Sequence, residues 1–523
     1  MYRLALIVKD SQAPPFTVLV KPCSQPLSLA SATDDEQKDA PLWDLPSVPF
    51  PVIDQHENVY EATCTVTPFV QKTLKDIGIF GLDAGNTVFQ LKSMLLPIWA
   101  QMQPWIYWKF VEEPDFGSGP EIHTVLFMTN VNVEEDVSTI GKWVTSEYAW
   151  SQLMAGKKET DARLGPLAAF AFSPHFPQSL RHRLKLSMNV QEYPPGVLVL
   201  PLKSATLKPF SKTNLVAFSS MGMLDQGAVT GLRGESLIVD PGCHPRDAQD
   251  ALSMVVKSLP KKMFIFLTHH HLDHTEGLPT VYKENPEAVI LAHELTIKRL
   301  GKVAKKLKCI PIADGMTIII GSEELQVIAA PGHTDGHMAL LHVLSHTLIV
   351  GDHCVGQGSS RLDATSGGNM KDYLATTRTF IRLAPRVIIP MHGKMNLWPL
   401  EMLKGYIRHR EDREAKILSC INQGAHTAFE IVSQAYADAP PAVWPAALSN
   451  AILHVDHLKE CKQLPEQFSM PFFRRSCGLG FFMRCMACSS FTRLKALCRK
   501  HQALWKASII SVVIGGVWIA WKR

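Results

Sequence analysis

A stretch of ten residues, THHHLDHTEG from Thr268 to Gly277, holds four histidines, an aspartate and a glutamate. It follows the apolar run MFIFL, which is typical of a buried strand. In a turn at a strand end, residues two apart can face the same side, so His269 and His271 can share one metal ion. Asp273 and His274 can serve a second ion. Imidazole nitrogen and carboxylate oxygen suit zinc, and an open coordination position is typical of a catalytic site.

Three histidines and one carboxylate are too few ligands for two metal ions, so further ligands are expected at later strand ends. They occur: His333 follows LQVIAA, Asp352 follows TLIVG, and His392 follows VIIPM. Asp240 ends the earlier run SLIVD, and we expect it to support the ligand loop together with Thr268. The alternative is a solvated, adventitious histidine-rich loop. Recurrence of ligands at successive strand ends favours a built site.

These segments together resemble the metallo-β-lactamase superfamily from about Pro194 to Pro399. The resemblance implies an αββα sandwich with two zinc ions at one edge of its sheets. By resemblance, one ion is bound by His269, His271 and His333, the other by Asp273, His274 and His392, and Asp352 bridges both. Manganese or iron fits the same ligands.

Within that superfamily, the segments PGHTDGHMALL, GDHCVGQGSS and YIRHREDREAKIL are similar to the group of β-lactamase-like protein 2. His353 departs from the group's pattern, in which a cysteine or another small residue is expected. The resemblance implies a metal-dependent endoribonuclease that acts on single-stranded RNA. Arg408 and Arg410, at the start of a predicted helix, agree with a phosphate-rich partner, although a solvated helix face is the commoner explanation of such charges.

Two neighbouring metal ions can activate water at neutral pH for attack on a carbonyl carbon or a phosphorus atom. Asp273 could both bind metal and orient the nucleophile, which makes it the candidate catalytic residue. The sequence has no G-x-S-x-G motif, so covalent catalysis by a serine is not indicated. His337 and His353 are candidates for the proton donor to the leaving group.

Two other functions use the same metal ligands. A thioester hydrolase of the glyoxalase II kind would direct the metal ions at a carbonyl, and the choice of substrate would rest with loops such as GQGSSRLDATSGGN. A metal-bound scaffold without catalysis is the third hypothesis. The presence of all seven expected ligands argues against the scaffold.

The elements that must position these residues are short apolar strands interleaved with helices such as DAQDALSMVVKSLP and DYLATTRTFIRLAP. This alternation predicts an α/β layer fold over residues 190–400. Residues 401–465 are expected to form a small winged-helix-like helical domain. Within it, Thr427 and Glu430 form a capping box at a helix start.

The first 175 residues mix strand and helix patterns. Their segments LALIVKD, VLVKP and LWDLP resemble the opening of a Nudix domain. The glutamate-rich helix that binds magnesium in that family is replaced by ATCTVTPFVQKTLKDIGIF, which has no such cluster. We therefore expect a Nudix-like α/β domain over residues 1–175 that is not catalytic.

The whole chain has 523 residues, 46% hydrophobic content and a net charge of +5, which predicts several folded domains. The mild positive charge permits an anionic substrate without requiring one. Eleven cysteines have no regular spacing, which favours reduced thiols in a cytosol-facing protein. The start MYRLALIVKD is typical of a strand rather than a signal peptide.

Residues 466–506 are expected to be a basic linker rich in cysteine and phenylalanine, in which Cys485 and Cys488 are free thiols. Residues 507–521 carry no charge and would span about 22 Å as a helix, short of the ~30 Å hydrocarbon core. We expect a C-terminal membrane anchor that holds the enzyme at the cytosolic face of a mitochondrion, plastid or peroxisome. The alternatives are an interfacial or packed helix and a soluble cytoplasmic protein.

Overall fold

The computed structural model describes residues 1–13, 16–23, 39–52, 65–112, 122–132, 137–154, 163–176, 190–221, 234–302 and 306–490. The chain folds into two compact units. The first comprises Met1–Pro331, Asp335–Ser360 and Ala375–Tyr406. The second comprises Gly332–Thr334, Arg361–Leu374 and Ile407–Arg523.

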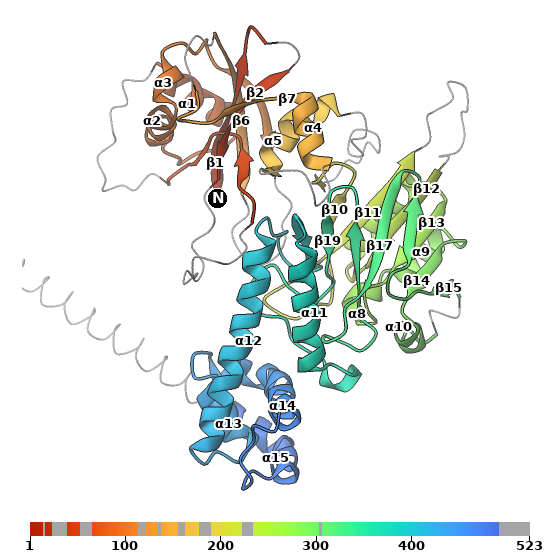
Figure 1. Ribbon diagram of the computed structural model, residues 1–523. Coiled ribbons are helices and arrows are strands. Elements are labelled where there is room, and N and C mark those ends of the chain that lie inside the picture. Colours follow the sequence, from red (N-terminus) through yellow and green to blue (C-terminus); the bar gives the residue numbers. More distant parts are fainter. Residues whose placement is uncertain are drawn as a thin grey trace, which may run out of the picture. The chain divides into compact units, whose positions relative to one another are not determined.

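An eight-stranded sheet lies at the N-terminal end of the first unit, with the order β5-β6-β1-β2-β3-β8, β4 beside β1 and β7 beside β2 (Figure 1). Its strands are β1 (Tyr2–Asp10), β2 (Thr17–Pro22), β3 (Leu42–Asp44), β4 (Ser47–Pro49), β5 (Ile106–Val111), β6 (His123–Val131), β7 (Lys142–Thr145) and β8 (Arg163–Leu164). The helices around it are α1 (Thr67–Asp76), α2 (Ala84–Met94), α3 (Leu96–Trp99), α4 (Ser146–Met154) and α5 (Pro166–Phe172). The predicted α/β character of this region is confirmed.

Two further sheets make up the rest of the first unit, with the orders β15-β14-β13-β12-β11-β10-β9 and β16-β17-β18-β19-β20. The strands of the first are β9 (Gln191–Glu192), β10 (Leu198–Lys203), β11 (Lys212–Met221), β12 (Gly234–Val239), β13 (Lys262–Phe266), β14 (Val289–Ala292) and β15 (Lys308–Pro311). Those of the second are β16 (Thr317–Ile320), β17 (Glu323–Ala329), β18 (Met338–His342), β19 (Thr347–Ile349) and β20 (Val387–Ile389). One buried core joins the two sheets and includes Phe218, Phe266 and Leu340.

Helices cover the outer face of the seven-stranded sheet, where Leu252 and Val255 belong to a second buried core. These helices are α7 (Arg246–Ser258), α9 (Leu278–Glu284) and α10 (Glu294–Arg299), while the short α8 (Leu272–Thr275) contributes no residue to this core. The stretch from Met370 to Leu383 forms α11. Helices packed on a sheet that is parallel from β12 to β15 confirm the predicted α/β fold.

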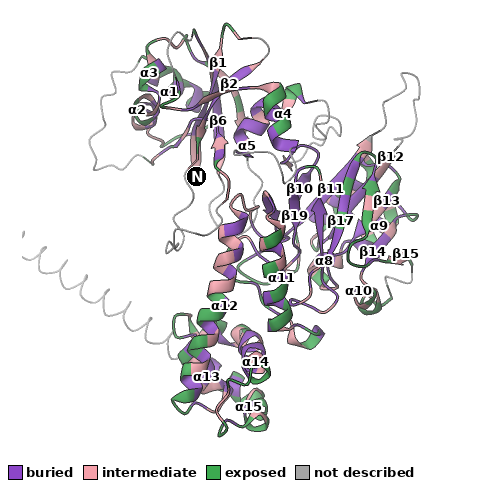
Figure 2. Ribbon diagram, viewed as in Figure 1, coloured by how far each residue is buried: buried purple, intermediate pink, exposed green. Residues whose placement is uncertain are grey.

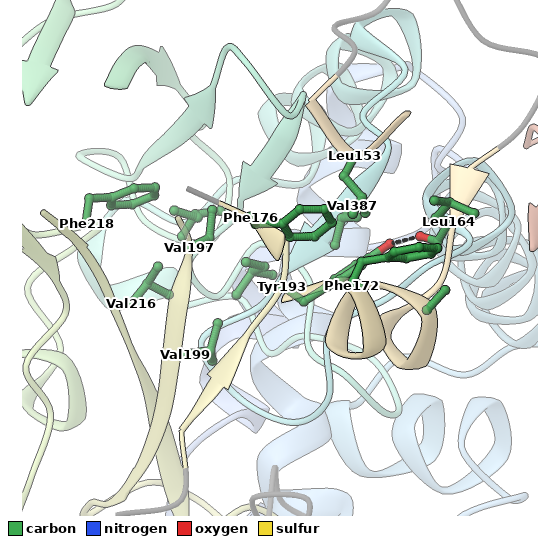
Figure 3. Close-up of a cluster of buried hydrophobic side chains, with 14 of the residues drawn as sticks. Leu153, Leu164, Phe172, Phe176, Tyr193, Val197, Val199, Val216, Phe218 and Val387 are labelled. Carbon is green, nitrogen blue, oxygen red and sulfur yellow. Dashed lines mark hydrogen bonds between the residues drawn. The ribbon is translucent and has the colours of Figure 1, made fainter. Parts of the chain in front are cut away.

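The N-terminal region shares the core that joins the two sheets (Figure 3). Leu153, Leu164 and Phe172 pack there with Tyr193 and Val387, and the Tyr193 hydroxyl donates a hydrogen bond of 2.6 Å to the Leu164 carbonyl. The regions predicted as separate domains therefore fold as parts of one compact unit.

The second unit is helical, with α12 (Pro399–Asn422) entering it at Ile407, α13 (Ala428–Ala435), α14 (Trp444–Glu460) and α15 (Met470–Ser476). The predicted capping box is confirmed: the Thr427 hydroxyl accepts from the Glu430 backbone N–H, and the Glu430 carboxylate accepts from the Thr427 N–H. Both bonds satisfy N–H groups that a helix start leaves without intrahelical partners.

The linker prediction is wrong for the residues described up to 490. Residues 470–476 and 479–490 are helical, and Phe473, Phe481 and Cys485 are buried in the core of the second unit. Among the described residues, no helix combines the length and apolar character needed to cross a bilayer. The predicted anchor at 507–521 lies outside the described residues.

Candidate metal centre

The predicted site residues of the first unit follow the ends of parallel strands. β12 pairs in parallel with β13, and β19 pairs in parallel with β20. Parallel strands present their carboxyl ends at one edge of a sheet, where the following loops meet. Hydrogen bonds join the two sheets at this edge, from Met338 N to Thr268 O (2.8 Å) and from Asn214 N to Met391 O (2.7 Å).

Asp240 is buried, and its carboxylate makes several hydrogen bonds to the histidine loop, Thr268–Gly277. One carboxylate oxygen accepts from the Thr268 backbone N–H (2.8 Å), and the other accepts from the Thr268 hydroxyl (2.6 Å) and from His274 Nδ1 (2.9 Å). Because the hydroxyl hydrogen of Thr268 is used in this way, its oxygen accepts from His269 Nδ1 at 3.0 Å. Asp240 thereby orients two imidazole rings, and the predicted supporting role of Asp240 and Thr268 agrees with this geometry.

Asp273, His274 and His392 form one group whose ligand atoms lie within 4.8 Å of one another. His392 Nδ1 donates to the Lys212 carbonyl at 2.8 Å, which directs Nε2 toward Asp273 at 3.3 Å. Asp352 adjoins this group, with one oxygen 3.4 Å from His392 Nε2 and the other 3.5 Å from His274 Nε2.

A second group contains His269, His271 and Asp352, again with ligand atoms within 4.8 Å of one another. His269 Nε2 lies 2.9 Å from His271 Nδ1. Asp352 therefore adjoins both groups, and its role as the bridging ligand stays a prediction.

His333, the seventh predicted ligand, belongs to the second unit. It is buried, and its Nδ1 donates to the Arg361 carbonyl at 2.7 Å, which leaves Nε2 as its ligand atom. Its place in the metal centre stays a prediction.

The electrostatics of the cluster favour a cation. Burial alone would raise the pKa of Asp352 and of Asp273, but His274 and His392 hold both pKa values below their usual range. Burial would lower the pKa of His392, yet the Asp352 charge and the hydrogen bonds to both aspartates raise it to about 9. The pKa of His274 is raised well above its ordinary value, against the effect of burial, by Asp352, Asp273 and Asp240.

The residues present fit a metal ion. His274 Nε2 is buried and makes no hydrogen bond within the part of the chain that the structure describes. Its neighbours are carboxylate oxygens of Asp352 and Asp273, at 3.5 and 3.7 Å. In His274 and His392, a hydrogen bond at Nδ1 fixes the tautomer that presents Nε2, as is usual for metal-binding histidines.

Two glycines permit this packing. A Cβ atom at Gly242 would lie 1.6 Å from the Asp273 carbonyl oxygen. At Gly351, which has a φ of +57°, it would lie 2.4 Å from His337 Nε2. A side chain at either position would displace a loop that carries a ligand.

The two predicted proton donors do not fit that role. His337 Nε2 accepts a hydrogen bond from the Asp352 backbone N–H at 3.2 Å, so it helps to position the backbone of Asp352. His353 is fully buried, with Nε2 2.8 Å from the Thr377 hydroxyl and its ring against Phe380. The sequence could not reveal these partners, because they come from distant segments.

The loop between β10 and β11 also contributes to the site and was not predicted. Thr206 Oγ1 lies 3.4 Å from His392 Nε2, and the Phe210 ring stacks on the His392 ring at 5.7 Å. The Glu276 carboxylate ties this loop to the histidine loop by accepting from Ala205 N at 2.8 Å. These residues belong to no motif, so no sequence signal marked them.

Comparison with known proteins agrees with this architecture. A family model described as the metallo-beta-lactamase superfamily matches residues 228–392. The beta-lactamase associated winged helix domain matches residues 427–461, which confirms the predicted winged-helix-like domain. Neither match reaches the first 175 residues, so the Nudix-like assignment stays a prediction.

Two curated relatives carry the name beta-lactamase-like protein 2 homolog, as the predicted resemblance implies. The protein of Caenorhabditis elegans is 28% identical over 246 residues, covering 45% of this chain and 79% of the relative. That of Drosophila melanogaster is 25% identical over 208 residues, covering 38% and 68%. A solved metallo-beta-lactamase family protein from Thermus thermophilus is 20% identical with a TM-score of 0.40, covering 51% of this chain and 94% of that one.

Proposed function

We propose that the chain is a dinuclear zinc phosphodiesterase that cuts single-stranded RNA, and the premise is the match of residues 228–392 to the metallo-beta-lactamase superfamily, whose members are metal-dependent hydrolases. The observation that carries the proposal is the pair of ligand groups that adjoin one carboxylate, Asp352. A carboxylate placed between two sets of histidines is what a bridged pair of metal ions requires.

The chain's own residues hold and orient this centre. Asp273, His274 and His392 would hold one ion, and His269, His271 and the predicted ligand His333 the other. When bound, the ions would activate water and stabilise negative charge that develops on the substrate. Asp273, with an ionised carboxylate beside His392, is placed to orient the attacking water through a hydrogen bond.

The loop beside His392 favours an anionic substrate. Lys208 is exposed, and Lys208 and Lys212 each lie two residues from Phe210, whose ring stacks on His392. Lysines at the rim of a metal centre can follow a phosphate backbone. Arg410 does not support an RNA partner, as its place in the predicted helix had suggested. It is buried, and its guanidinium lies over the Tyr373 ring at 4.9 Å.

The direct test uses the full chain reconstituted with zinc, incubated with a single-stranded RNA oligonucleotide and separately with a model thioester. We expect RNA cleavage that falls by about 10²–10⁴-fold in Asp273→Asn, since the metal centre loses an ionised ligand. Asp247→Asn is the matched control, because Asp247 is exposed and pairs with Lys203. If the thioester is hydrolysed while the RNA stays intact, RNA is not the substrate, but the assignment as a metal-dependent hydrolase still holds.

Lys208→Gln tests the substrate class separately. It should weaken RNA binding and reduce the slope of log affinity against log salt by about 0.7, the value for one phosphate contact on a single strand. An unchanged slope would show that this loop does not contact the phosphate backbone.

A further inference from the structure

The end of the second unit exposes an apolar face. Helical residues 470–476 and 479–490 carry five large hydrophobic side chains that are 40–76% exposed. We call this set the apolar face: Phe472, Leu479, Phe482, Met483 and Met486. The first of them lies on α15, which is followed by the helical residues 479–490 (Figure 2).

The helix at 479–490 is apolar on two sides. Phe481 and Cys485, one turn apart, are buried in the core of the second unit. Leu479, Phe482, Met483 and Met486 follow the spacing i, i+3, i+4, i+7, which places them on one side of the helix. A helix with apolar stripes on two sides needs a second environment for the stripe that its own core does not cover.

The charge of this region selects the class of partner. From Gln467 to Arg523 the sequence holds ten lysines and arginines and no aspartate or glutamate. Near the face, Arg474 is paired with Asp456 at 2.5 Å, and Arg484 lies over the Phe429 ring at 5.6 Å. Arg475 is exposed. Exposed apolar side chains on a segment that is rich in basic residues and holds no acidic residue of its own are typical of a helix that lies in an anionic membrane interface.

We propose that the apolar face docks on the surface of an anionic phospholipid bilayer, with its helix in the plane of the interface. Phe, Leu and Met side chains would enter the boundary between headgroups and acyl chains, and Arg475 would meet the headgroup phosphates. The sequence after the apolar face also suits a bilayer surface, because residues 491–523 add further basic residues and the uncharged stretch 507–521.

The experiment measures co-sedimentation of the full chain with phosphatidylcholine vesicles, with and without phosphatidylserine. Val513→Asp places a charge within residues 507–521 and serves as the background, so that the apolar face is tested apart from that stretch. In this background the chain should still bind the anionic vesicles. Adding Leu479→Glu and Met483→Glu should lower the bound-to-free ratio by about tenfold or more.

Phe80→Glu is the matched control, since Phe80 is 73% exposed in the first unit. Leu479→Ser is the milder variant should the double substitution disturb folding, and Arg475→Gln should reduce the preference for phosphatidylserine. The proposal would be overturned if the variants of the apolar face bound the anionic vesicles as well as the Phe80→Glu control does. Loss of all binding in Val513→Asp alone, or displacement of the face from vesicles by single-stranded RNA, would also overturn it.

Discussion

Asp240 orients more than one of the candidate metal ligands. Its carboxylate accepts from Thr268 and His274, and through the Thr268 hydroxyl it also orients His269. Its backbone has a φ of +47°, so the fold holds a non-glycine residue in the left-handed region here. Asp240→Asn keeps the size of the side chain and removes its charge. We expect metal affinity to fall by about 10–100-fold, as competition with a chelator would measure.

Asp247→Asn is the control for that substitution, because it removes a carboxylate of the same unit at an exposed site. Equal metal affinity in both variants would contradict the supporting role of Asp240.

Metal uptake should release protons. With the pKa of His392 raised to about 9 and that of His274 raised well above its ordinary value, both rings are protonated near pH 7 without a metal ion. A metal ion binds only the deprotonated imidazole, so binding must displace these protons and affinity must rise with pH toward 9. Calorimetric titration in buffers of different ionisation enthalpy should show about one to two protons released per chain. A heat that is the same in every buffer would contradict this assignment.

At this scale the candidate ligands could be assigned from local sequence, because each histidine or aspartate follows an apolar strand. It did not predict the partners of His337 and His353, or the approach of Phe210 to His392. Such contacts depend on side-chain packing between distant segments, which spacing alone does not encode.

Among the elements, α12 and α14 are linked by a carboxylate–histidine group in which His454 is buried and Glu414 and His457 are half-buried. Glu414 of α12 contacts His454 Nδ1 at 3.1 Å and His457 Nδ1 at 2.9 Å. Burial lowers the pKa of His454 to about 4, although the hydrogen bond with Glu414 opposes this shift. The folded state therefore keeps this ring neutral where the unfolded chain, with a pKa near 6.5, takes up a proton.

His454 should make the second unit less stable as the pH falls. Its contribution is fully present above about pH 6.5 and falls toward pH 4, by on the order of 3 kcal/mol. The free energy of unfolding of the native chain minus that of His454→Gln should therefore decrease between about pH 7 and pH 5. His457→Gln, at a partly exposed site, is the control. A difference that is independent of pH would contradict the lowered pKa.

The elements themselves were predictable where the signal is local. The capping box at Thr427 and Glu430 and the strands before the ligand loops needed only neighbouring residues. The helices at 470–490 were mistaken for a linker, because their burial depends on the fit of Phe473 and Phe481 to a core built by other helices.

Within the first unit, the N-terminal sheet shares one buried core with the seven-stranded and five-stranded sheets. Arg163 connects the same regions by hydrogen bonds. The Arg163 guanidinium donates to the carbonyls of Ala40, Arg386 and Leu397. Arg163→Met keeps much of the volume and leaves these partly buried carbonyls without their donor. We expect a loss of about 2–4 kcal/mol in the free energy of unfolding, measured by urea denaturation.

The first unit should also unfold in one transition, since the shared core couples its parts. Arg246→Met, at an exposed position of α7, should change stability by less than about 0.5 kcal/mol. Two separated transitions, or equal effects of the two substitutions, would contradict the coupling. The sequence predicted two domains here because a shared core leaves no composition signal in either region.

Metal analysis of the purified full chain is the most direct test of the central claim, that the histidine and aspartate residues at the strand ends form a metal centre. Inductively coupled plasma mass spectrometry should find about two transition-metal ions per chain, falling to about one or fewer in His274→Ala. His293→Ala is the control, because His293 caps α10 outside both ligand groups. A chain free of transition metal after growth and reconstitution with zinc, or a metal content equal in both variants, would contradict the account.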